Sequence, residues 1–155
     1  MTSSTFSDKI RLKLSMLWIF VVANYLYCDV LSLMDPTFLR VLLQGGPPGL
    51  PMTESFLLYA GMLMEIPMAM IVVSRLLEHR ANRWLNLVAG ALMAMVQIGS
   101  FWMGTGPTLH YVFFSAVEIA ILASIVWTAW KWTATGTDER SVEGSPMATT
   151  TLRQP

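Results

Sequence analysis

Long apolar stretches separated by short polar connections dominate the chain. Four stretches reach the length of about 20 residues that a bilayer crossing needs, and they cover residues 14–34, 53–77, 84–103 and 108–130. A backbone in lipid must satisfy its own hydrogen bonds, and none of the stretches alternates as a barrel strand would, so each is predicted to be helical. The expected fold is all-α, a bundle of four transmembrane helices.

The connection after the first span carries a second apolar pattern. Residues 38–43 are predicted to form a short amphipathic helix that lies at the membrane interface. The sequence GGPPGLP that follows is predicted to turn, because proline cannot continue a helix and glycine relaxes the backbone. The segment is either a lid over an outward-facing cavity or a plain connector resting on the headgroups.

Basic residues indicate how the spans are oriented. Nine of the ten lie in residues 1–13, in residues 74–84 around the connection between the second and third spans, or after the last span, and Arg40 is the exception. Connections rich in Lys and Arg face the cytoplasm, so both termini are predicted to be cytoplasmic. A signal peptide is disfavoured, because no small-x-small cleavage site follows the first apolar run.

Composition agrees with a membrane protein and limits the other functional classes. Charged residues make up 13% of the chain, against about 25% in soluble domains. The net charge of zero gives no indication of a nucleic-acid partner, and the single Cys28 cannot form an internal disulfide. We expect residues 1–13 to be a cytoplasmic N-terminus, 14–132 the membrane domain and 133–155 a disordered cytoplasmic tail, because that tail is polar and lacks an apolar period.

Polar side chains interrupt all four predicted spans. At about 1.5 Å per helical residue, Asn24, Glu65 and Glu118 lie roughly 14–17 Å from the outer ends of their helices. Asp29 and Gln97 lie roughly 8–9 Å from those ends. We therefore expect one polar layer, extending from the midplane to the outer leaflet, and no such groups in the inner half.

Carboxyl groups at this depth are costly unless they are sheltered. An ionised carboxylate at the centre of a membrane costs about 2.5–3.5 kcal/mol, and no Lys or Arg lies at that depth to neutralise it. Gly61, Glu65 and Ala69 form a small–polar–small stripe that favours contact with a neighbouring helix. We therefore expect Glu65 and Glu118 to face one sheltered chamber, where a neutral carboxyl could both donate and accept a proton.

Simpler interpretations remain open for each of these residues. Glu65 and Glu118 could form structural hydrogen bonds between helices, and Asp29 could reach headgroup water. Asn24 and Gln97 could hold helices together, and His110, near the outer end of the fourth span, could be an interfacial residue.

Four stretches of the chain resemble a known family. They are LWIFVVANYLYCDVLSLMDP (17–36), LMEIPMAMIVVSR (63–75), HRANRWLNLVAG (79–90) and FFSAVEIAILASIVWTAWKW (113–132). They are similar to a family of small, uncharacterised four-helix membrane proteins, mostly bacterial, over about residues 10–132. The resemblance implies a four-helix membrane fold and no particular activity, and the architecture is similar to that of DoxX-like proteins and sterol-isomerase-like bundles.

Three functions fit the polar layer. The first is binding of a lipophilic small molecule, extended to cofactor-independent isomerisation, cyclisation or hydrolysis by acid–base chemistry. The second is proton-coupled transport by an oligomer of this chain, and the third is a non-catalytic membrane subunit. We expect a plasma-membrane location, the lipid bilayer as partner, and no cofactor, metal or nucleic acid. The candidate catalytic residues are Glu65, Glu118 and Asp29, and the candidate ligand-binding residues are Asn24, Tyr25, Gln97 and His110.

Overall fold

The computed structural model describes residues 3–47, 50–102 and 107–132, and this part of the chain forms five α-helices and no strand. The helices are α1 (Ser3–Met34), α2 (Pro36–Leu43), α3 (Glu54–Leu76), α4 (His79–Ser100) and α5 (Leu109–Lys131). The predicted all-α fold is confirmed. The predicted tail, residues 133–155, lies outside the described residues.

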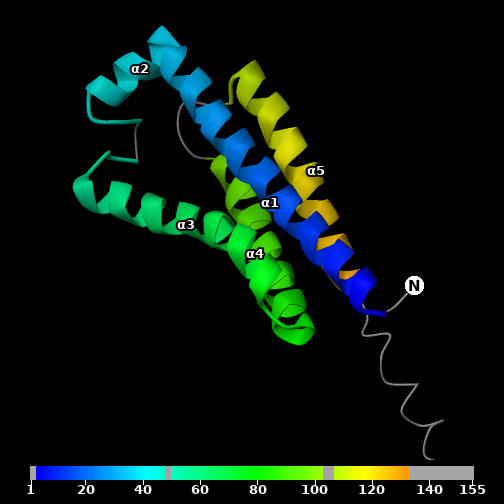
Figure 1. Ribbon diagram of the computed structural model, residues 1–155. Helices are drawn as coiled ribbons and strands as arrows, with labels where there is room; N and C mark the ends of the chain where they lie inside the picture. The colour runs from blue at the N-terminus through cyan, green and yellow to red at the C-terminus, as the bar shows by residue number, and fades with distance from the viewer. Residues whose placement is uncertain (1–2, 48–49, 103–106, 133–155) are drawn as a thin grey trace, which may run out of the picture.

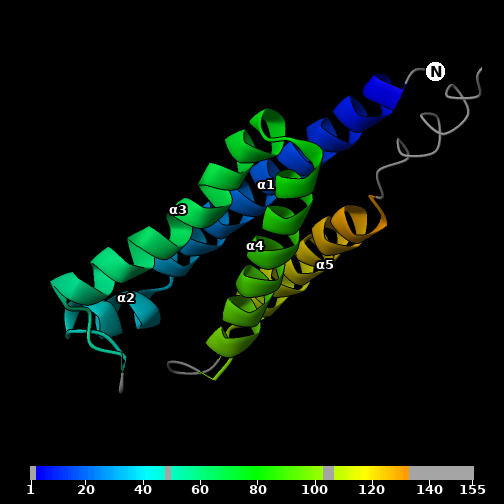
Figure 2. The same ribbon diagram turned by 90° about the horizontal axis from the view of Figure 1, so that it is seen from below.

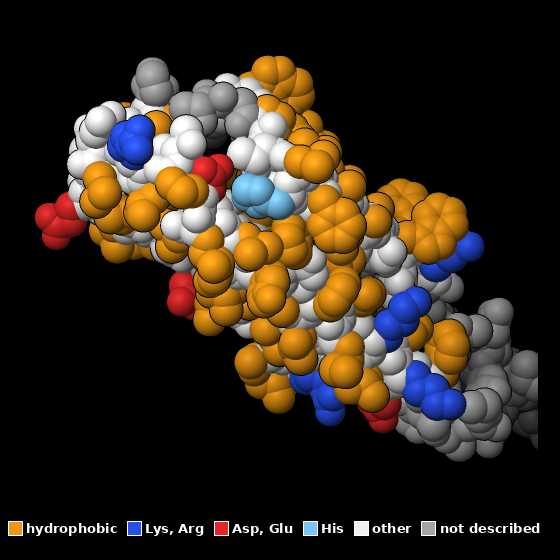
Figure 3. Space-filling model, turned by 90° about the horizontal axis from the view of Figure 1, so that it is seen from above, with side chains coloured by type: hydrophobic (Ala, Val, Ile, Leu, Met, Phe, Trp, Pro, Cys, Tyr) orange, Lys and Arg blue, Asp and Glu red, His pale blue; other side chains and the backbone are white. Residues whose placement is uncertain are grey.

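The four long helices run alternately in opposite directions (Figure 1). The start of α1, the connection between α3 and α4, and the end of α5 therefore lie at one end of the molecule, which we call the basic end. Hydrophobic side chains cover most of the face shown in Figure 3, and Lys and Arg gather at one extremity of it. The basic end holds Lys9, Arg11, Lys13, Arg75, Arg80, Arg83 and Lys131, whereas Arg40 lies on α2 at the opposite end.

Within the described residues, three helices are long and apolar enough to cross a membrane. They are Phe6–Met34 within α1, Glu54–Leu76 and Leu109–Lys131, and they suggest a membrane protein. The third predicted span corresponds to α4, which is not among the three. Its apolar character is diluted by Asn82, Asn86 and Gln97, all of which are buried within the protein.

Helix α1 begins well before the first predicted span. The apolar run starts at residue 14, but the helix already starts at Ser3. Residues 3–34 contain no glycine or proline, and the Lys, Arg and Leu residues of its early turns are good helix formers. Hydropathy therefore located the apolar part of the helix and not its beginning.

The predicted short helix after the first span is confirmed as α2. Asp35 caps it by accepting a hydrogen bond from the Thr37 backbone N–H at 2.8 Å, and Pro36 occupies the first turn, where its missing N–H costs nothing. No residue of α2 is buried. The turn that follows contains Gly45 and Gly46, both at φ +102°, a conformation that glycine adopts without a Cβ clash.

The core lies between α1, α4 and α5, and α3 covers one side of it. Leu14, Trp18, Leu122 and Ile125 are fully buried there. Helices α4 and α5 approach closely at Gly90, where a Cβ would lie 2.9 Å from Val126 Cγ2.

Helix α3 packs against α1, and its start lies apart from α4, as both views show (Figures 1 and 2). Only 11% of its most apolar window is buried, against 33% for the other two candidate spans. Most of α3 therefore faces the surroundings of the protein.

Candidate functional site

A chain of polar contacts occupies the core near the end of the molecule that is opposite the basic end. The Gln97 amide donates to Ser115 Oγ at 2.7 Å, which joins α4 to α5. The Ser100 hydroxyl donates to the Gln97 carbonyl at 2.6 Å and also contacts the Tyr111 hydroxyl. Since Gln97 and Ser115 are both buried, these bonds satisfy polar groups that would otherwise lack water as a partner.

Glu118 lies deeper in the core, one turn beyond Ser115 on the same face of α5. Its side chain is 1% exposed, and its Oε1 atom has no hydrogen-bond partner among the described residues. Tyr25 of α1 is 8% exposed, and its hydroxyl also lacks a partner there. Tyr25 belongs to α1 and Glu118 to α5, two helices that pack against each other in the core. The core thus contains a carboxyl and a phenol whose hydrogen-bonding capacity the described residues leave unused.

The structure places the two remaining predicted ligand-binding residues, Asn24 and His110, differently. Asn24 is buried and donates to the Phe20 carbonyl of its own helix at 3.0 Å. His110 is half-buried near the start of α5, with its Nε2 atom 3.3 Å from Ser32 Oγ. Asn24 neighbours Tyr25 in sequence, while His110 lies two turns of α5 beyond Glu118.

The structure does not place Glu65 in this group. Glu65 is exposed, whereas Pro67, Met70 and Ser74 form the buried face of α3. Pro67 is two residues away and is therefore rotated by about 200° around the helix. The prediction that Glu65 and Glu118 face one chamber is wrong, because the small–polar–small stripe lies on the outer side of α3.

Asp29 occupies an intermediate position. Asp29 is exposed, although it follows Tyr25 by one helical turn on α1. It borders the buried pair and is not enclosed with it.

A second polar cluster lies in the half of the core nearer the basic end, where none was expected. Asn86 Oδ1 accepts from Trp18 Nε1 at 2.7 Å and from Ser74 Oγ at 3.3 Å. The Asn86 amide donates to the Asn82 side-chain oxygen at 2.7 Å and to the Asn82 carbonyl at 2.8 Å. The four side chains of this cluster are fully buried, namely those of Trp18, Ser74, Asn82 and Asn86. This cluster joins α1, α3 and α4, and the expectation that the inner half lacks polar groups is therefore wrong.

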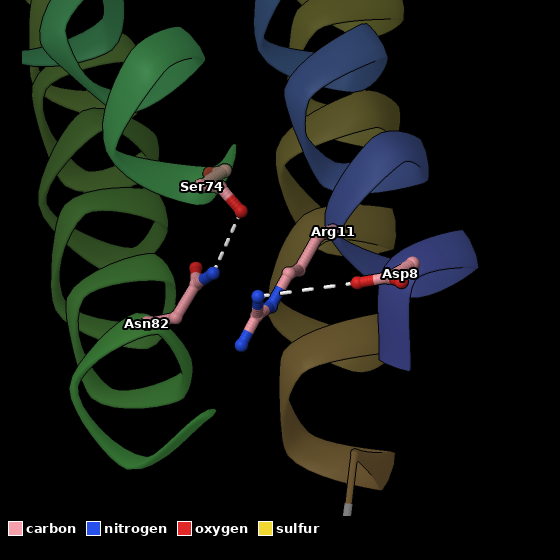
Figure 4. A network of polar contacts seen from close by, with 4 residues as sticks. All are labelled: Asp8, Arg11, Ser74 and Asn82. Carbon is pink, nitrogen blue, oxygen red and sulfur yellow. Dashed lines mark hydrogen bonds and ion pairs between the residues drawn. The ribbon is translucent and has the colours of Figure 1, made fainter. Parts of the chain in front are cut away.

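The close view of the basic end shows the edge of this second cluster (Figure 4). The Asn82 amide donates to the Ser74 carbonyl at 2.7 Å, which fastens the end of α3 to the start of α4. Arg11 reaches from α1 towards this connection and lies 4.0 Å from Asp8. In the sequence, Asn82, Asn86, Ala89, Met93 and Gln97 recur every three or four residues, a helical stripe that could have located the cluster.

Metal-binding side chains do not gather in the described part of the chain. There, no three residues of the types His, Cys, Asp and Glu lie close enough together to hold an ion. Cys28 is buried and free. The polar groups of the described core are thus single carboxyl, phenol, amide, hydroxyl, indole and thiol groups.

The model of a family of unknown function, DUF6326, matches residues 1–138. The chain belongs to this family. No curated protein and no solved structure matches the chain. Membership confirms the resemblance to an uncharacterised family and assigns no activity.

Proposed function

We propose that this DUF6326 member is a multi-pass protein of the plasma membrane with four spans and cytoplasmic termini. Helix α4 joins the basic end of α3 to the opposite end of α5, so it must cross the membrane if its two neighbours do. At about 1.5 Å per residue, its 22 residues extend about 33 Å, which is enough to span the hydrocarbon core. The basic residues at one end support a cytoplasmic orientation of that end.

We further propose that the core around Glu118 and Tyr25 binds a lipophilic small molecule that carries a hydrogen-bonding group. The observation that carries this proposal is the pair of buried polar atoms without partners, Glu118 Oε1 and the Tyr25 hydroxyl. An unsatisfied buried polar group costs about 1–3 kcal/mol. A ligand hydroxyl or carbonyl placed between the two atoms would remove this cost. The protein would then bind ligands that carry such a group in preference to ligands that lack it.

The same pair could move a proton on a bound molecule. A carboxyl and a phenol can each donate or accept a proton, and acid–base chemistry without a cofactor needs one group of each role. Because Glu65 lies outside the core, Tyr25 takes the place that the sequence had suggested for a second carboxyl. Isomerisation or cyclisation at this site would extend the binding function.

Mass spectrometry of molecules that copurify with the full chain tests the binding function. Glu118→Gln keeps the shape of the side chain and Tyr25→Phe removes only the hydroxyl, while Glu65→Gln makes the same chemical change outside the core. We expect wild type and Glu65→Gln to retain the same small molecule, and Glu118→Gln and Tyr25→Phe to lose most of it. Circular dichroism verifies that each variant is folded.

Two results would refute the proposal. One is a wild-type protein, purified in mild detergent, from which no small molecule can be extracted. The other is equal retention by Glu118→Gln, Tyr25→Phe and wild type, because the orphaned atoms would then have no part in binding.

Proton-coupled transport is a second candidate, favoured by the distribution of polar groups along the core. The Asn82–Asn86 cluster lies on one side of Glu118, and Gln97 and Ser115 lie on the other. Buried apolar residues, including Val21 and Leu122, separate the first cluster from Glu118 and would have to open during transport. Four spans offer little room for a path, so an oligomer is required. A liposome assay in which Glu118→Gln abolishes uptake driven by a pH gradient would favour this function over simple binding.

A further inference from the structure

A cavity of about 320 Å³ lies at the basic end, beside the first two turns of α4. His79, Arg80, Arg83 and Trp84 line it. It is remote from Glu118, and its lining shares no residue with the core around Glu118 and Tyr25. Its lining has two guanidinium groups, one imidazole and one indole, and no acidic side chain.

The end of α5 holds part of this lining in place. Arg83 donates through one terminal nitrogen to the Trp130 carbonyl at 3.3 Å. The His79 ring packs edge-on against Trp132, with centroids 4.6 Å apart, and its Nε2 atom lies 3.2 Å from the Trp132 carbonyl. Trp132 is 3% exposed. The cavity therefore has a fixed wall, because side chains of α4 are tied to the last residues of α5.

The cationic groups retain unused donors. Arg83 Nε is buried and has no partner among the described residues, and Arg80 is exposed. The one ion pair found in the described part of the chain joins Arg11 to Asp8, so neither cavity arginine has a carboxylate counter-ion there. A site with uncompensated positive charge and free N–H donors is suited to an anion.

Phosphate is the anion that this geometry fits best. Guanidinium groups bind phosphate oxygens through two parallel N–H donors. The cavity also borders the start of the 22-residue α4, where Glu78 makes no side-chain cap hydrogen bond, so the positive end of the helix dipole adds to the attraction. Trp84 is 66% exposed, as tryptophan commonly is where a protein meets the headgroup region.

We propose that the cavity lined by His79, Arg80, Arg83 and Trp84 binds a phosphate group at the membrane surface. Anionic lipid headgroups and soluble phosphate share this chemistry. Basic pockets on the cytoplasmic side of membrane proteins commonly hold lipid headgroups. Comparing the binding of an anionic lipid with that of inorganic phosphate distinguishes the lipid headgroup from soluble phosphate.

Native mass spectrometry of the full chain in a neutral detergent, titrated with phosphatidylglycerol, provides the test. Phosphatidylcholine is the zwitterionic reference, and inorganic phosphate is the soluble probe. Arg80→Gln and Arg83→Gln remove lining charges, while Arg75→Gln removes an exposed charge at the same end outside the cavity. We expect phosphatidylglycerol to bind more tightly than phosphatidylcholine, and Arg80→Gln to weaken its binding about fivefold, with Arg75→Gln close to wild type.

The outcomes are distinct. Binding of inorganic phosphate as tight as that of phosphatidylglycerol, with the same dependence on Arg80, supports the site and identifies a soluble phosphate as its ligand. Equal binding of the two lipids, or equal weakening by Arg75→Gln and Arg80→Gln, overturns it, because diffuse surface charge would then explain the attraction. Arg83→Gln also removes a bond to α5, so Arg80→Gln keeps the test valid if Arg83→Gln does not fold.

Discussion

Replacing Asn86 with leucine should destabilise the protein more than any other single polar-to-apolar change in its core. The substitution keeps the approximate volume and removes the acceptor of Trp18 Nε1 (2.7 Å) and the donor to Asn82 Oδ1 (2.7 Å). Both partners are fully buried, so water cannot replace the lost bonds.

The magnitude follows from the three buried side-chain groups left without a partner, Trp18 Nε1, Ser74 Oγ and Asn82 Oδ1. Each stranded buried group costs about 1–3 kcal/mol in soluble proteins, while hydrogen bonds between membrane helices average about 0.6 and reach about 1.7 kcal/mol. We therefore expect Asn86→Leu to lower the free energy of unfolding by about 2–5 kcal/mol. Asn24→Leu should lower it less, because Asn24 bonds only to its own helix.

Reversible unfolding in mixed micelles, followed by circular dichroism, measures this effect. A double-mutant cycle of Trp18→Phe and Asn86→Leu isolates the bond between them from changes in packing, and we expect a coupling energy of about 0.6–1.7 kcal/mol. An Asn86→Leu protein as stable as wild type, or a coupling energy of zero, would refute the role assigned to this cluster.

Two further predictions concern the helices. Gly90→Ala should cost about 1–2 kcal/mol, because its Cβ would lie 2.9 Å from Val126 Cγ2, whereas Gly61→Ala, with nothing within 4 Å, should be neutral or stabilising by up to about 1 kcal/mol. The free energy of unfolding of both variants tests the close approach of α4 and α5 at Gly90. Adding Val126→Ala to Gly90→Ala should restore stability. Equal effects of the two glycine substitutions would contradict the close approach. Asp35→Ala removes the cap bond to Thr37 and should destabilise α2 locally by about 0.5–2 kcal/mol. Hydrogen exchange should become faster in α2 alone, and unchanged exchange there would show that the cap is dispensable.

Hydropathy predicted the number and approximate positions of the long helices, but not which way α3 faces. This helix is apolar almost all around, and lipid provides no hydrophobic force that would select a face. The sequence predicted that Glu65 faces the interior of the bundle. Pro67 and Ser74 instead lie on the buried side of α3. Small residues there allow α1 to approach, and the Ser74 hydroxyl donates a hydrogen bond to Asn86 Oδ1.

The cluster around Asn86 was missed for a related reason. Arg80 and Arg83 flank Asn82, so this stretch resembled a cytoplasmic connection, and the third span was drawn from residue 84. Helix α4 in fact starts at His79, which brings Asn82 into the core beside Asn86, a residue that already lay within the predicted third span. In contrast, the inward orientation of Glu118, Tyr25 and Gln97 was predicted from the sequence, because each interrupts an apolar run on one face of a helix, and all three are buried.

The central claim is that Glu118 lies inside the core with Tyr25 while Glu65 lies outside it. Modification by a bulky hydrophobic carbodiimide, followed by peptide mass spectrometry, tests this directly in protein reconstituted in liposomes. We predict that Glu65 is modified first and that Glu118 reacts only after the protein is unfolded. Modification of Glu118 as fast as Glu65 in the folded protein would contradict the arrangement, and with it the binding function proposed for the core.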